Sequence, residues 1–377
     1  MMRRIVLSVT NDLVTDQRVH RACTALHEEG YKVTLIGRML PESGAVKRDY
    51  STVRMKLLFK KKAIFYAEYN IRLFLKLMFV RTDAFYANDT DTLVANYLAS
   101  RIRHKPMFFD AHEMFPEVPE LVGRDRVKRF WTRIEDFIFP KIARRDDMAA
   151  VTVCQSIAEI YKQRYGLEMA VVRNVPMSYN NTTIMQQEPL LTIPEGKKIL
   201  LYQGAVNIGR GIEWVMDVMP QLPDCHLVIA GVGDIYDALV EKKQKDGTEN
   251  ITFLGRVAPD KLHSLTPKAS LGLSLLENRG LNYYYSLPNR IADFVAARVP
   301  VLATDFPEIH RVVEKYGIGT LVPDGCKDLA AKIRESLSYW EALPEDEREA
   351  RFCCAAKDLS WENDKKILLC KVDTIFS

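Results

Sequence analysis

Short apolar runs alternate with helical patterns along almost the whole chain, and this alternation limits the fold more than any other feature. In the first helical pattern, residues 16–30, four apolar side chains share one face, namely those of Val19, Ala22, Cys23 and Leu26. The apolar runs that predict strands in the first half are residues 4–9, 31–37, 53–58, 84–87, 107–110, 149–153 and 170–172. Strands joined by helices lie parallel and are covered on both faces, so the sequence predicts an α/β fold.

The alternation stops near residue 174 and begins again near residue 198, which predicts two domains. The segment between is rich in Pro, Asn, Thr and Gln, as is typical of a linker. We expect two doubly wound, Rossmann-like domains that face each other across a cleft. The first domain is expected at residues 1–175 and the second at 198–356, with a linker at 176–197 between them. A C-terminal helix at 357–377 is expected to cross back to the first domain. Ligands of such sheets bind beyond the carboxyl ends of the strands, so the loops there are the candidate sites.

The cysteine and apolar patterns disfavour several classes of protein. The seven cysteines show no CxxC and no metal-ligand spacing, which is typical of reduced thiols. No apolar stretch reaches the roughly 18 residues that a membrane span needs. The N-terminal apolar run is cut off by Asn11 and Asp12, so we expect a first strand there and no signal peptide. These patterns predict a cytoplasmic protein, and the net charge of +4 is too small to favour nucleic acid as a partner.

A glycine-rich loop, "YQGAVNIGRGIE", follows the first apolar run of the second half. Gly204 ends the run, and Gly209 and Gly211 flank Arg210 at the start of a helical pattern. Glycines let an anion approach the backbone, a helix start carries positive partial charge, and an arginine binds phosphate in a bidentate manner. The same residues are equally typical of a glycine-rich turn with a solvated arginine.

The stretch "YYYSLPNRIADF" predicts a helix start that suits a nucleotide. Ser286 is the expected N-cap, and Pro288 suits the first turn. Arg290 and Asp293, three residues apart, then share a face. Arg290 and the free backbone N–H groups suit a diphosphate, and the Asp293 carboxylate suits vicinal ribose hydroxyls. The alternative is an ordinary surface pair.

A second pair of glycines, Gly231 and Gly233, follows the next apolar run. Tyr236 occupies the position of the third glycine in a dinucleotide fingerprint, which disfavours a nicotinamide cofactor and favours a tight turn.

In the first half, Asp110, His112 and Glu113 follow a predicted strand. A histidine that shares such a loop with two carboxylates is a candidate for proton handling. No further ligand stands at a convincing spacing, so we expect catalysis here and no metal.

These motifs resemble the family-four retaining glycosyltransferases of the GT-B fold, and the resemblance covers essentially the whole chain. The segments that carry it include "FDAHEMFPEVPEL", "YQGAVNIGRGIE", "ITFLGRVAPDKL" and "YSLPNRIADFVAARVPVLATDFPEI", of which the last is the most specific. The opening segment, with Asn11 and Asp12, is similar to the family's first unit.

The resemblance implies roles for individual residues. It makes His112 the active-site histidine, which orients the reacting groups and is not a nucleophile. It places Asn11, Asp12 and Glu113 on the acceptor side. The donor would be bound by Gly204, Arg210, Arg256, Val257, Ser286, Leu287, Pro288, Asn289, Arg290 and Asp293.

Two departures from the family pattern affect the donor site. A second basic residue often follows the first glycine of the loop, where this chain has Ala205. The family's donor helix often carries two glutamates separated by seven residues, and these positions are Tyr285 and Asp293 here. Glu277 lies upstream and is a candidate substitute for the first glutamate.

The resemblance further implies transfer of a sugar from a nucleotide diphosphate sugar to a glycan, lipid-linked or other acceptor. It implies retention of the anomeric configuration, a part in polysaccharide or glycoconjugate synthesis, and no cofactor or metal. The alternatives are a nucleotide-sugar epimerase of the same fold and a non-catalytic two-domain binding protein. Residues 47–81 carry ten basic and two acidic residues, which suits peripheral contact with the inner face of a membrane or, equally, a buried helix with solvated lysines.

Overall fold

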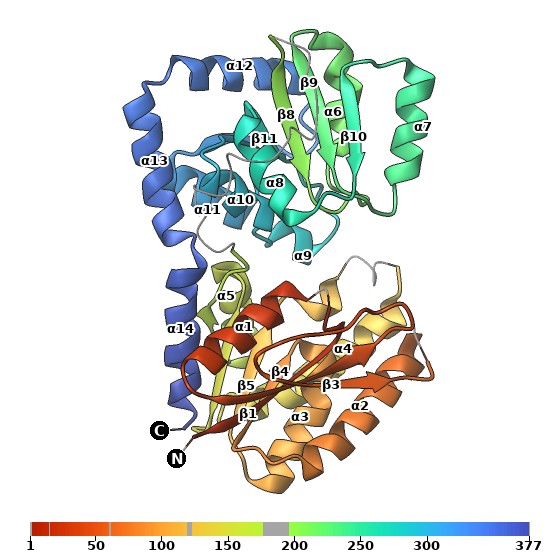
Figure 1. Cartoon of the computed structure of the whole chain (residues 1–377), viewed down its shortest axis with the longest axis vertical. Coiled ribbons are helices and arrows are strands. Elements are labelled where there is room, and N and C mark those ends of the chain that lie inside the picture. The colour runs from red at the N-terminus through yellow and green to blue at the C-terminus, as the bar shows by residue number, and fades with distance from the viewer. Residues whose placement is uncertain (1, 15, 60–61, 119–122, 176–195, 377) are drawn as a thin grey trace. The chain divides into compact units, whose positions relative to one another are not determined.

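The computed structural model describes residues 2–14, 16–59, 62–118, 123–175 and 196–376 (Figure 1). The chain divides into two compact units. Unit 1 is Met1–Asn174 with Asp364–Ser377, and unit 2 is Val175–Asn363. The linker expected at 176–197 lies outside the described residues except for its last two positions.

Unit 1 contains a seven-stranded sheet in the order β3-β2-β1-β4-β5-β6-β7, with every neighbouring pair parallel. Its strands are β1 (Arg4–Asp12), β2 (Lys32–Met39), β3 (Ser51–Lys56), β4 (Ala84–Asn88), β5 (Met107–Ala111), β6 (Met148–Thr152) and β7 (Ala170–Val171). The order reverses between β1 and β4, and the loops that diverge at such a point leave room for a ligand.

In the described part of unit 1 the helices are α1 (Gln17–Glu28), α2 (Lys62–Phe79), α3 (Thr90–Arg103), α4 (Asp125–Ile142), α5 (Gln155–Tyr165) and the short η1 (Phe115–Glu117). Helix α14 (Trp361–Thr374) joins them from Asp364 onward. Helices α2 and α3 bury side chains against one face of the sheet, including Tyr69, Leu73 and Ala95 over Val6 and Phe85. Helix α1 covers the other face (Figure 1). Its predicted apolar face is buried, and Asp16 caps it by accepting a hydrogen bond from the backbone of Val19 at 3.0 Å.

Strand β1 is longer than the sequence predicts. The prediction ended it before Asn11 and Asp12, whereas the strand runs to Asp12. The Asp12 carboxylate is buried there because Arg54 of β3 donates a hydrogen bond to it at 3.3 Å and its own strand pairs with β2 at Arg38. The hydrogen bond from Arg54 of β3 therefore allows Asp12 to be the last residue of β1 although it is buried.

The last helix, α14, is tied to unit 1 by a buried ion pair. Asp364 is fully buried, accepts a hydrogen bond from the backbone nitrogen of Arg173 at 2.6 Å, and binds the guanidinium of the same residue at 2.7 Å. At the surface, Lys365 pairs with Glu28 of α1.

Unit 2 contains a six-stranded sheet in the order β10-β9-β8-β11-β12-β13, again parallel throughout. Its strands are β8 (Lys198–Gln203), β9 (Cys225–Ala230), β10 (Ile251–Gly255), β11 (Leu271–Ser274), β12 (Val301–Thr304) and β13 (Gly319–Val322). Its helices are α6 (Ile212–Val218), α7 (Tyr236–Asp246), α8 (Pro259–Leu265), α9 (Leu281–Tyr284), α10 (Asn289–Ala296), α11 (Pro307–Tyr316), α12 (Leu329–Ala342) and α13 (Glu345–Asp358), with the short η4 (Met219–Gln221) and η5 (Thr266–Lys268). The strand order reverses between β8 and β11. Two doubly wound parallel sheets confirm the predicted α/β fold class.

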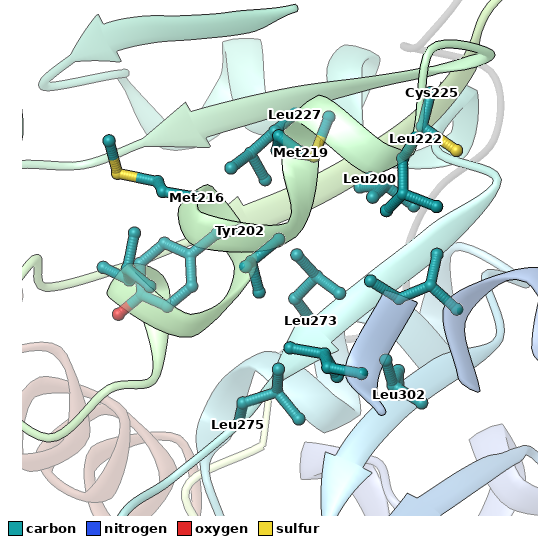
Figure 2. Close-up of a cluster of buried hydrophobic side chains, with 14 of the residues drawn as sticks. Leu200, Tyr202, Met216, Met219, Leu222, Cys225, Leu227, Leu273, Leu275 and Leu302 are labelled. Atoms are coloured by element: carbon teal, nitrogen blue, oxygen red, sulfur yellow. The ribbon is translucent and has the colours of Figure 1, made fainter. Parts of the chain in front are cut away.

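The core of unit 2 reaches the carboxyl end of β8. Figure 2 shows Leu200, Tyr202, Met216 and Leu273 among the side chains of this apolar cluster. The ring of Tyr202 is therefore held firmly by the core, at the point where the chain leaves the sheet and enters the predicted glycine-rich loop.

Candidate functional site

His112 lies in the turn after β5, at the carboxyl edge of the unit 1 sheet, between two carboxylates. Its Nδ1 is 3.1 Å from Oδ2 of Asp89, and its Nε2 is 3.6 Å from Oδ2 of Asp110. Its backbone nitrogen donates a hydrogen bond to Oδ1 of Asp89 at 2.7 Å. Strand pairing causes this meeting, because Asn88 of β4 is in register with Asp110 of β5 and Asp89 comes next.

Arg18 of α1 balances the second carboxylate. Its Nη2 lies 2.6 Å from Oδ1 of Asp110, and both side chains are buried. Tyr86 of β4 donates a hydrogen bond to the other oxygen of Asp110 at 2.8 Å. Asp89, His112, Asp110 and Arg18 thus form a row of alternating charge.

This row keeps His112 protonated. Burial lowers the pKa of His112, but the charges of Asp89 and Asp110 more than offset that effect and raise it to about 10. Burial raises the pKa of Asp110, but the charges of Arg18 and His112 more than offset this effect and hold that pKa below its usual range. At neutral pH His112 is therefore a cation that donates hydrogen bonds, and not a base that takes up a proton.

A third carboxyl group, which lies beside this row, is neutral at pH 7. Asp91, at the start of α3, is buried and hydrogen-bonded to Thr10 of β1. Burial, followed by the charge of Asp89, raises the pKa of Asp91 to about 8. Sequence reasoning missed Arg18, Asp89 and Asp91. The signal for the two aspartates was present, since "NDTD" directly follows the predicted strand at 84–87.

The structure gives the expected acceptor-side residues different surroundings. Glu113 is half-buried in the turn next to His112. Asn11 is exposed and donates a hydrogen bond to Asp16 at 2.9 Å. Asp12 accepts hydrogen bonds from Arg54, from the backbone of Val14 and from Ser43, so it holds together the loops after β1 and β2.

In unit 2, the loops after β8 and β9 touch backbone to backbone. A Cβ on Gly231 would lie 1.8 Å from the carbonyl oxygen of Gly204, and one on Gly233 would lie 2.4 Å from that of Val206. The nitrogen of Gly204, whose φ is +119°, also donates a hydrogen bond to Ala230 at 2.9 Å. These glycines are needed for close packing at the carboxyl edge of the sheet.

Arg290 lies next to this glycine contact. Its guanidinium carbon is 4.2 Å from the centre of the Tyr202 ring, and a Cβ on Gly204 would be 3.7 Å from its Nη2. Although Arg290 is only 7% exposed, its buried Nη1 has no hydrogen-bond partner within the described parts of the chain. A cation held over an aromatic ring with an unsatisfied buried nitrogen suits an anionic ligand.

Ser286 is not the N-cap that the sequence predicts for this helix. Helix α10 begins at Asn289 with Pro288 at the N-cap, and the Ser286 hydroxyl donates a hydrogen bond back to the carbonyl of Tyr283 at 3.0 Å. The reason is that α9 ends just before Ser286, which closes that turn instead of opening the next. Asn289 is exposed on the first turn of α10, and Leu287 is half-buried beside it.

Asp293 is held by a chain of buried polar groups. Gln203, the last residue of β8, donates a hydrogen bond to Oδ2 of Asp293 at 3.2 Å. The Thr266 hydroxyl donates to the amide oxygen of Gln203 at 2.9 Å, and both residues are buried. Arg290 and Asp293 therefore meet the end of β8 from the same helix. Sequence reasoning missed Gln203 and Thr266, for which no local pattern gives a signal.

Arg210 repeats the arrangement of Arg290. Its guanidinium carbon lies 4.6 Å from the centre of the Tyr283 ring, and its buried Nε has no hydrogen-bond partner among the residues described. The nitrogen of Glu277 donates a hydrogen bond to the carbonyl of Gly209 at 3.0 Å, and its carboxylate pairs with Arg279 at 2.7 Å. Glu277 therefore lies beside the glycine-rich loop.

Arg256 and Val257 complete the set of expected donor residues. They follow β10, which is separated from β8 by β9. Arg256 is exposed and Val257 is half-buried.

Within the described residues, no group of three or more His, Cys, Asp or Glu side chains is arranged to hold a metal ion. None of the described helices is long and apolar enough to cross a membrane.

The sequence models of two families match the chain. Residues 16–176 match the family described as Glycosyltransferase Family 4, and residues 197–338 match the family described as Glycosyl transferases group 1. Each match covers the greater part of one sheet and its helices.

Two curated proteins resemble parts of the chain. The putative colanic acid biosynthesis glycosyl transferase WcaI of Escherichia coli K12 is 28% identical over 153 residues, which make up 39% of this chain and 37% of that protein. An uncharacterized glycosyltransferase of Methanocaldococcus jannaschii is 27% identical over 185 residues, or 46% of this chain and 44% of that protein. The matched part spans less than half the length of either relative.

Solved structures resemble the whole chain in fold. A sucrose-phosphate synthase from Thermosynechococcus elongatus aligns with a TM-score of 0.75 at 16% identity, covering 99% of both chains. Anabaena HepE in complex with UDP-glucose aligns with a TM-score of 0.72 at 14% identity, covering 98% of this chain and 99% of that one. At these identities the likeness concerns the fold, which is that of GT-B glycosyltransferases.

Proposed function

We propose that this chain, whose two halves match models of glycosyltransferase families, moves a sugar from a nucleotide diphosphate sugar to an acceptor with retention of the anomeric configuration. The acceptor in this proposal is a glycan or a lipid-linked glycan, and the product belongs to polysaccharide or glycoconjugate synthesis. The complex of UDP-glucose with the similar Anabaena HepE supports a nucleotide-sugar donor. Retention rests on the resemblance to the retaining family. The epimerase and binding-protein alternatives are not favoured by the family matches.

The observation that carries the proposal is the buried Nη1 of Arg290, which has no hydrogen-bond partner among the described residues. Burying a guanidinium nitrogen without a partner costs free energy, roughly 1–3 kcal/mol for a polar group and more for a charged one. A phosphate oxygen would accept the missing hydrogen bond in a bidentate manner. Arg210 offers a second such nitrogen at the neighbouring loop.

The chemistry proposed for these groups is stabilisation of the departing diphosphate. As the bond between the anomeric carbon and the diphosphate oxygen breaks, negative charge develops on the phosphates. In this proposal Arg290, Arg210 and the N–H groups at the start of α10 stabilise that charge. We therefore propose that the reaction needs no metal ion.

Two side chains orient the substrates in this proposal. The Asp293 carboxylate, fixed by Gln203 at one oxygen, accepts hydrogen bonds from the ribose. On the acceptor side, His112 donates a hydrogen bond as an imidazolium and orients the reacting groups. Its pKa of about 10 supports a charged donor in preference to a general base.

Contact with an anionic membrane surface is a further part of the proposal. Helix α2 buries one stripe in the core and exposes a second stripe of large apolar side chains, Ile64, Ile71, Leu75 and Phe79. Exposed apolar side chains next to basic residues of the stretch 47–81 suit the interface of a bilayer.

A thermal-shift panel with nucleoside diphosphates and their sugars tests the donor site. A ligand that binds the folded state raises the melting temperature according to RT ln(1 + [L]/Kd). We expect one base to give a selective rise, and Arg290→Ala and Asp293→Ala to lose it. Arg311→Ala, which removes an exposed arginine of α11, is the matched control and should keep the rise. If no nucleotide shifts the wild-type protein, or if Arg290→Ala keeps the full shift, the proposed donor site is wrong.

A further inference from the structure

A pocket with a volume of about 340 Å³ opens in unit 1 where β2 and β3 end. Met39 and Lys56 are in register at the ends of these two strands. The lining combines two cations, Arg38 and Lys56, with apolar walls that include Met39, Leu57, Phe59 and Phe65. Among the described residues, no carboxylate lines it.

The Arg38 side chain lies against an aromatic ring in this pocket, and no ion pair with a carboxylate of the described residues neutralises its charge. Its guanidinium carbon lies 5.1 Å from the centre of the Phe65 ring. Its Nε is buried, and the structure gives it no hydrogen-bond partner in the described residues. A cation in these surroundings is best satisfied by an anion that enters from outside.

One acidic group near the pocket, Glu68, already has partners of its own. Glu68 of α2 accepts hydrogen bonds from the backbone nitrogens of Leu58 and Phe59, at 3.0 and 2.9 Å, and pairs with Arg72 at 2.8 Å. It thereby fixes the wall that contains Phe59 and does not compete for Arg38. The pocket consequently keeps an excess of positive charge.

The apolar part of the pocket continues out to its rim. Leu58 is 78% exposed and Phe59 is 43% exposed, and the exposed stripe of α2 begins with Ile64 nearby in the chain. Sites that bind a free sugar need carboxylates or amides for its hydroxyl groups. The described lining has none of these, whereas its two cations and apolar walls match a phosphate joined to a hydrocarbon chain.

The position of the pocket suits an acceptor. It opens at the same edge of the sheet as His112, which follows β5, and β2 and β5 are three strand spacings apart in the sheet. At roughly 4.8 Å per spacing, that is about 14 Å. The separation leaves room for a short glycan between a phosphate in the pocket and a hydroxyl group at His112.

We propose that the pocket of Arg38 and Lys56 binds the phosphate of a lipid-linked acceptor, with the adjoining hydrocarbon chain lying against Phe59, Leu57 and the rim. This inference rests on the proposed function, because it names the acceptor class of the same enzyme. A phosphate ester of a long alcohol supplies both chemistries that the pocket offers.

Binding of farnesyl phosphate, measured by isothermal titration calorimetry below its micellar range, tests the proposal. We expect Arg38→Gln and Lys56→Gln each to weaken binding by about ten-fold, the order of one charge-assisted hydrogen bond. Lys32→Gln, which removes an exposed lysine at the start of β2, should bind as wild type does. Met39→Trp, which fills the pocket without changing its charge, should also weaken binding.

Three comparison probes identify the source of the phosphate. Inorganic phosphate and farnesol should each bind much more weakly than farnesyl phosphate, because each offers half of the required chemistry. Phosphatidylcholine vesicles, with and without phosphatidic acid, test a bilayer lipid as the occupant. If phosphatidic acid vesicles bind wild type and Arg38→Gln alike while farnesyl phosphate does not bind, the surface docks on membranes and the pocket assignment fails. Equal affinity for inorganic phosphate would also overturn it.

The nucleotide panel on unit 2 separates this inference from the proposed function. If the wild-type protein does not bind farnesyl phosphate but shows a nucleotide-induced thermal shift that depends on Arg290, only the acceptor pocket is refuted. The reverse result, binding that depends on Arg38 without any nucleotide shift, refutes the donor site and leaves the pocket standing.

Discussion

Asp89 binds His112 at two points, through its backbone nitrogen at 2.7 Å and through Nδ1 of its ring at 3.1 Å. Asp89 itself has φ of +60° and ψ of 164°, a backbone conformation that costs a non-glycine residue roughly 1–3 kcal/mol. The two contacts to His112 offset this strain. One carboxylate thus sets the position of the histidine turn and the charge of its ring.

The first prediction follows from that pair. Asp89→Asn removes one of the two negative charges that offset burial, so the pKa of His112 should fall from about 10 towards its usual range. Titration of the imidazole signals by NMR measures the shift, and the other six histidines of the chain serve as internal controls. An unchanged pKa in this variant would mean that Asp110 alone keeps His112 charged.

The second prediction concerns Asp91 and pH. Its pKa is about 8 in the folded chain against an ordinary value of 3.8, so the folded state binds the proton more tightly than the unfolded state. The resulting stabilisation is complete below about pH 4 and is lost as the pH rises through about 8. Asp91→Asn does not titrate, and it should therefore gain stability relative to wild type between these values.

Chemical denaturation at about pH 5 and about pH 9 measures this difference. We expect the variant to be the more stable protein at the higher pH, where the wild type must bury a carboxylate. The matched control is Asp49→Asn at an exposed site, which should show no such crossover. A constant difference between variant and wild type at both pH values would contradict the prediction.

The third prediction concerns the contact between the loops after β8 and β9. Gly231→Ala would place a methyl group 1.8 Å from the carbonyl oxygen of Gly204, so one of the two loops must move. We expect unit 2 to lose about 1–3 kcal/mol of stability and nucleotide binding to weaken, because Arg290 lies against Gly204. Gly44→Ala, at a glycine with open space around it, should have little effect. Unchanged nucleotide affinity in Gly231→Ala would separate this contact from the donor site.

The parts of the structure that sequence predicted are those with a local cause. Parallel strands buried on both faces leave continuous apolar runs, so both sheets were predictable, and the fold confirms them. The turn with Asp110 and His112 was identified because chemistry-bearing residues follow a strand directly. Asp89 and Arg18 were missed because strand pairing and helix packing, not sequence neighbours, bring them to His112.

The misplaced helix start at Ser286 has a similar explanation. Serine is a favoured N-cap, but the choice between closing one turn and opening the next depends on where α9 ends. Asp12 likewise ends β1 instead of interrupting it, because Arg54 reaches it from β3. Local propensity ranks the options at such positions, and tertiary partners decide between them.

The fourth prediction concerns the polar chain that holds Asp293. Gln203→Met keeps the length of the side chain but removes the donor to Oδ2 of Asp293, so the carboxylate loses its fixed orientation. Binding of the preferred nucleoside diphosphate should weaken by about ten-fold, as expected for loss of one hydrogen bond to a charged group. The penalty for a deoxyribose in place of ribose should shrink in the variant. A full deoxyribose penalty in Gln203→Met would show that Asp293 does not need this hydrogen bond.

The last prediction concerns the attachment of α14 to unit 1. Asp364 is fully buried and binds both the backbone and the guanidinium of Arg173, so Asp364→Ala leaves a largely buried cation without its partner. Breaking one side of a buried pair costs on the order of 3–5 kcal/mol, against less than about 1 kcal/mol for an exposed pair. Lys365→Gln removes the neighbouring exposed pair with Glu28 and is the matched control. Denaturant unfolding should therefore show a large loss for Asp364→Ala and almost none for Lys365→Gln. Because Asp364 belongs to unit 1, the nucleotide-induced thermal shift of unit 2 should survive in both variants, and its loss in Asp364→Ala would indicate that the two units do not unfold independently.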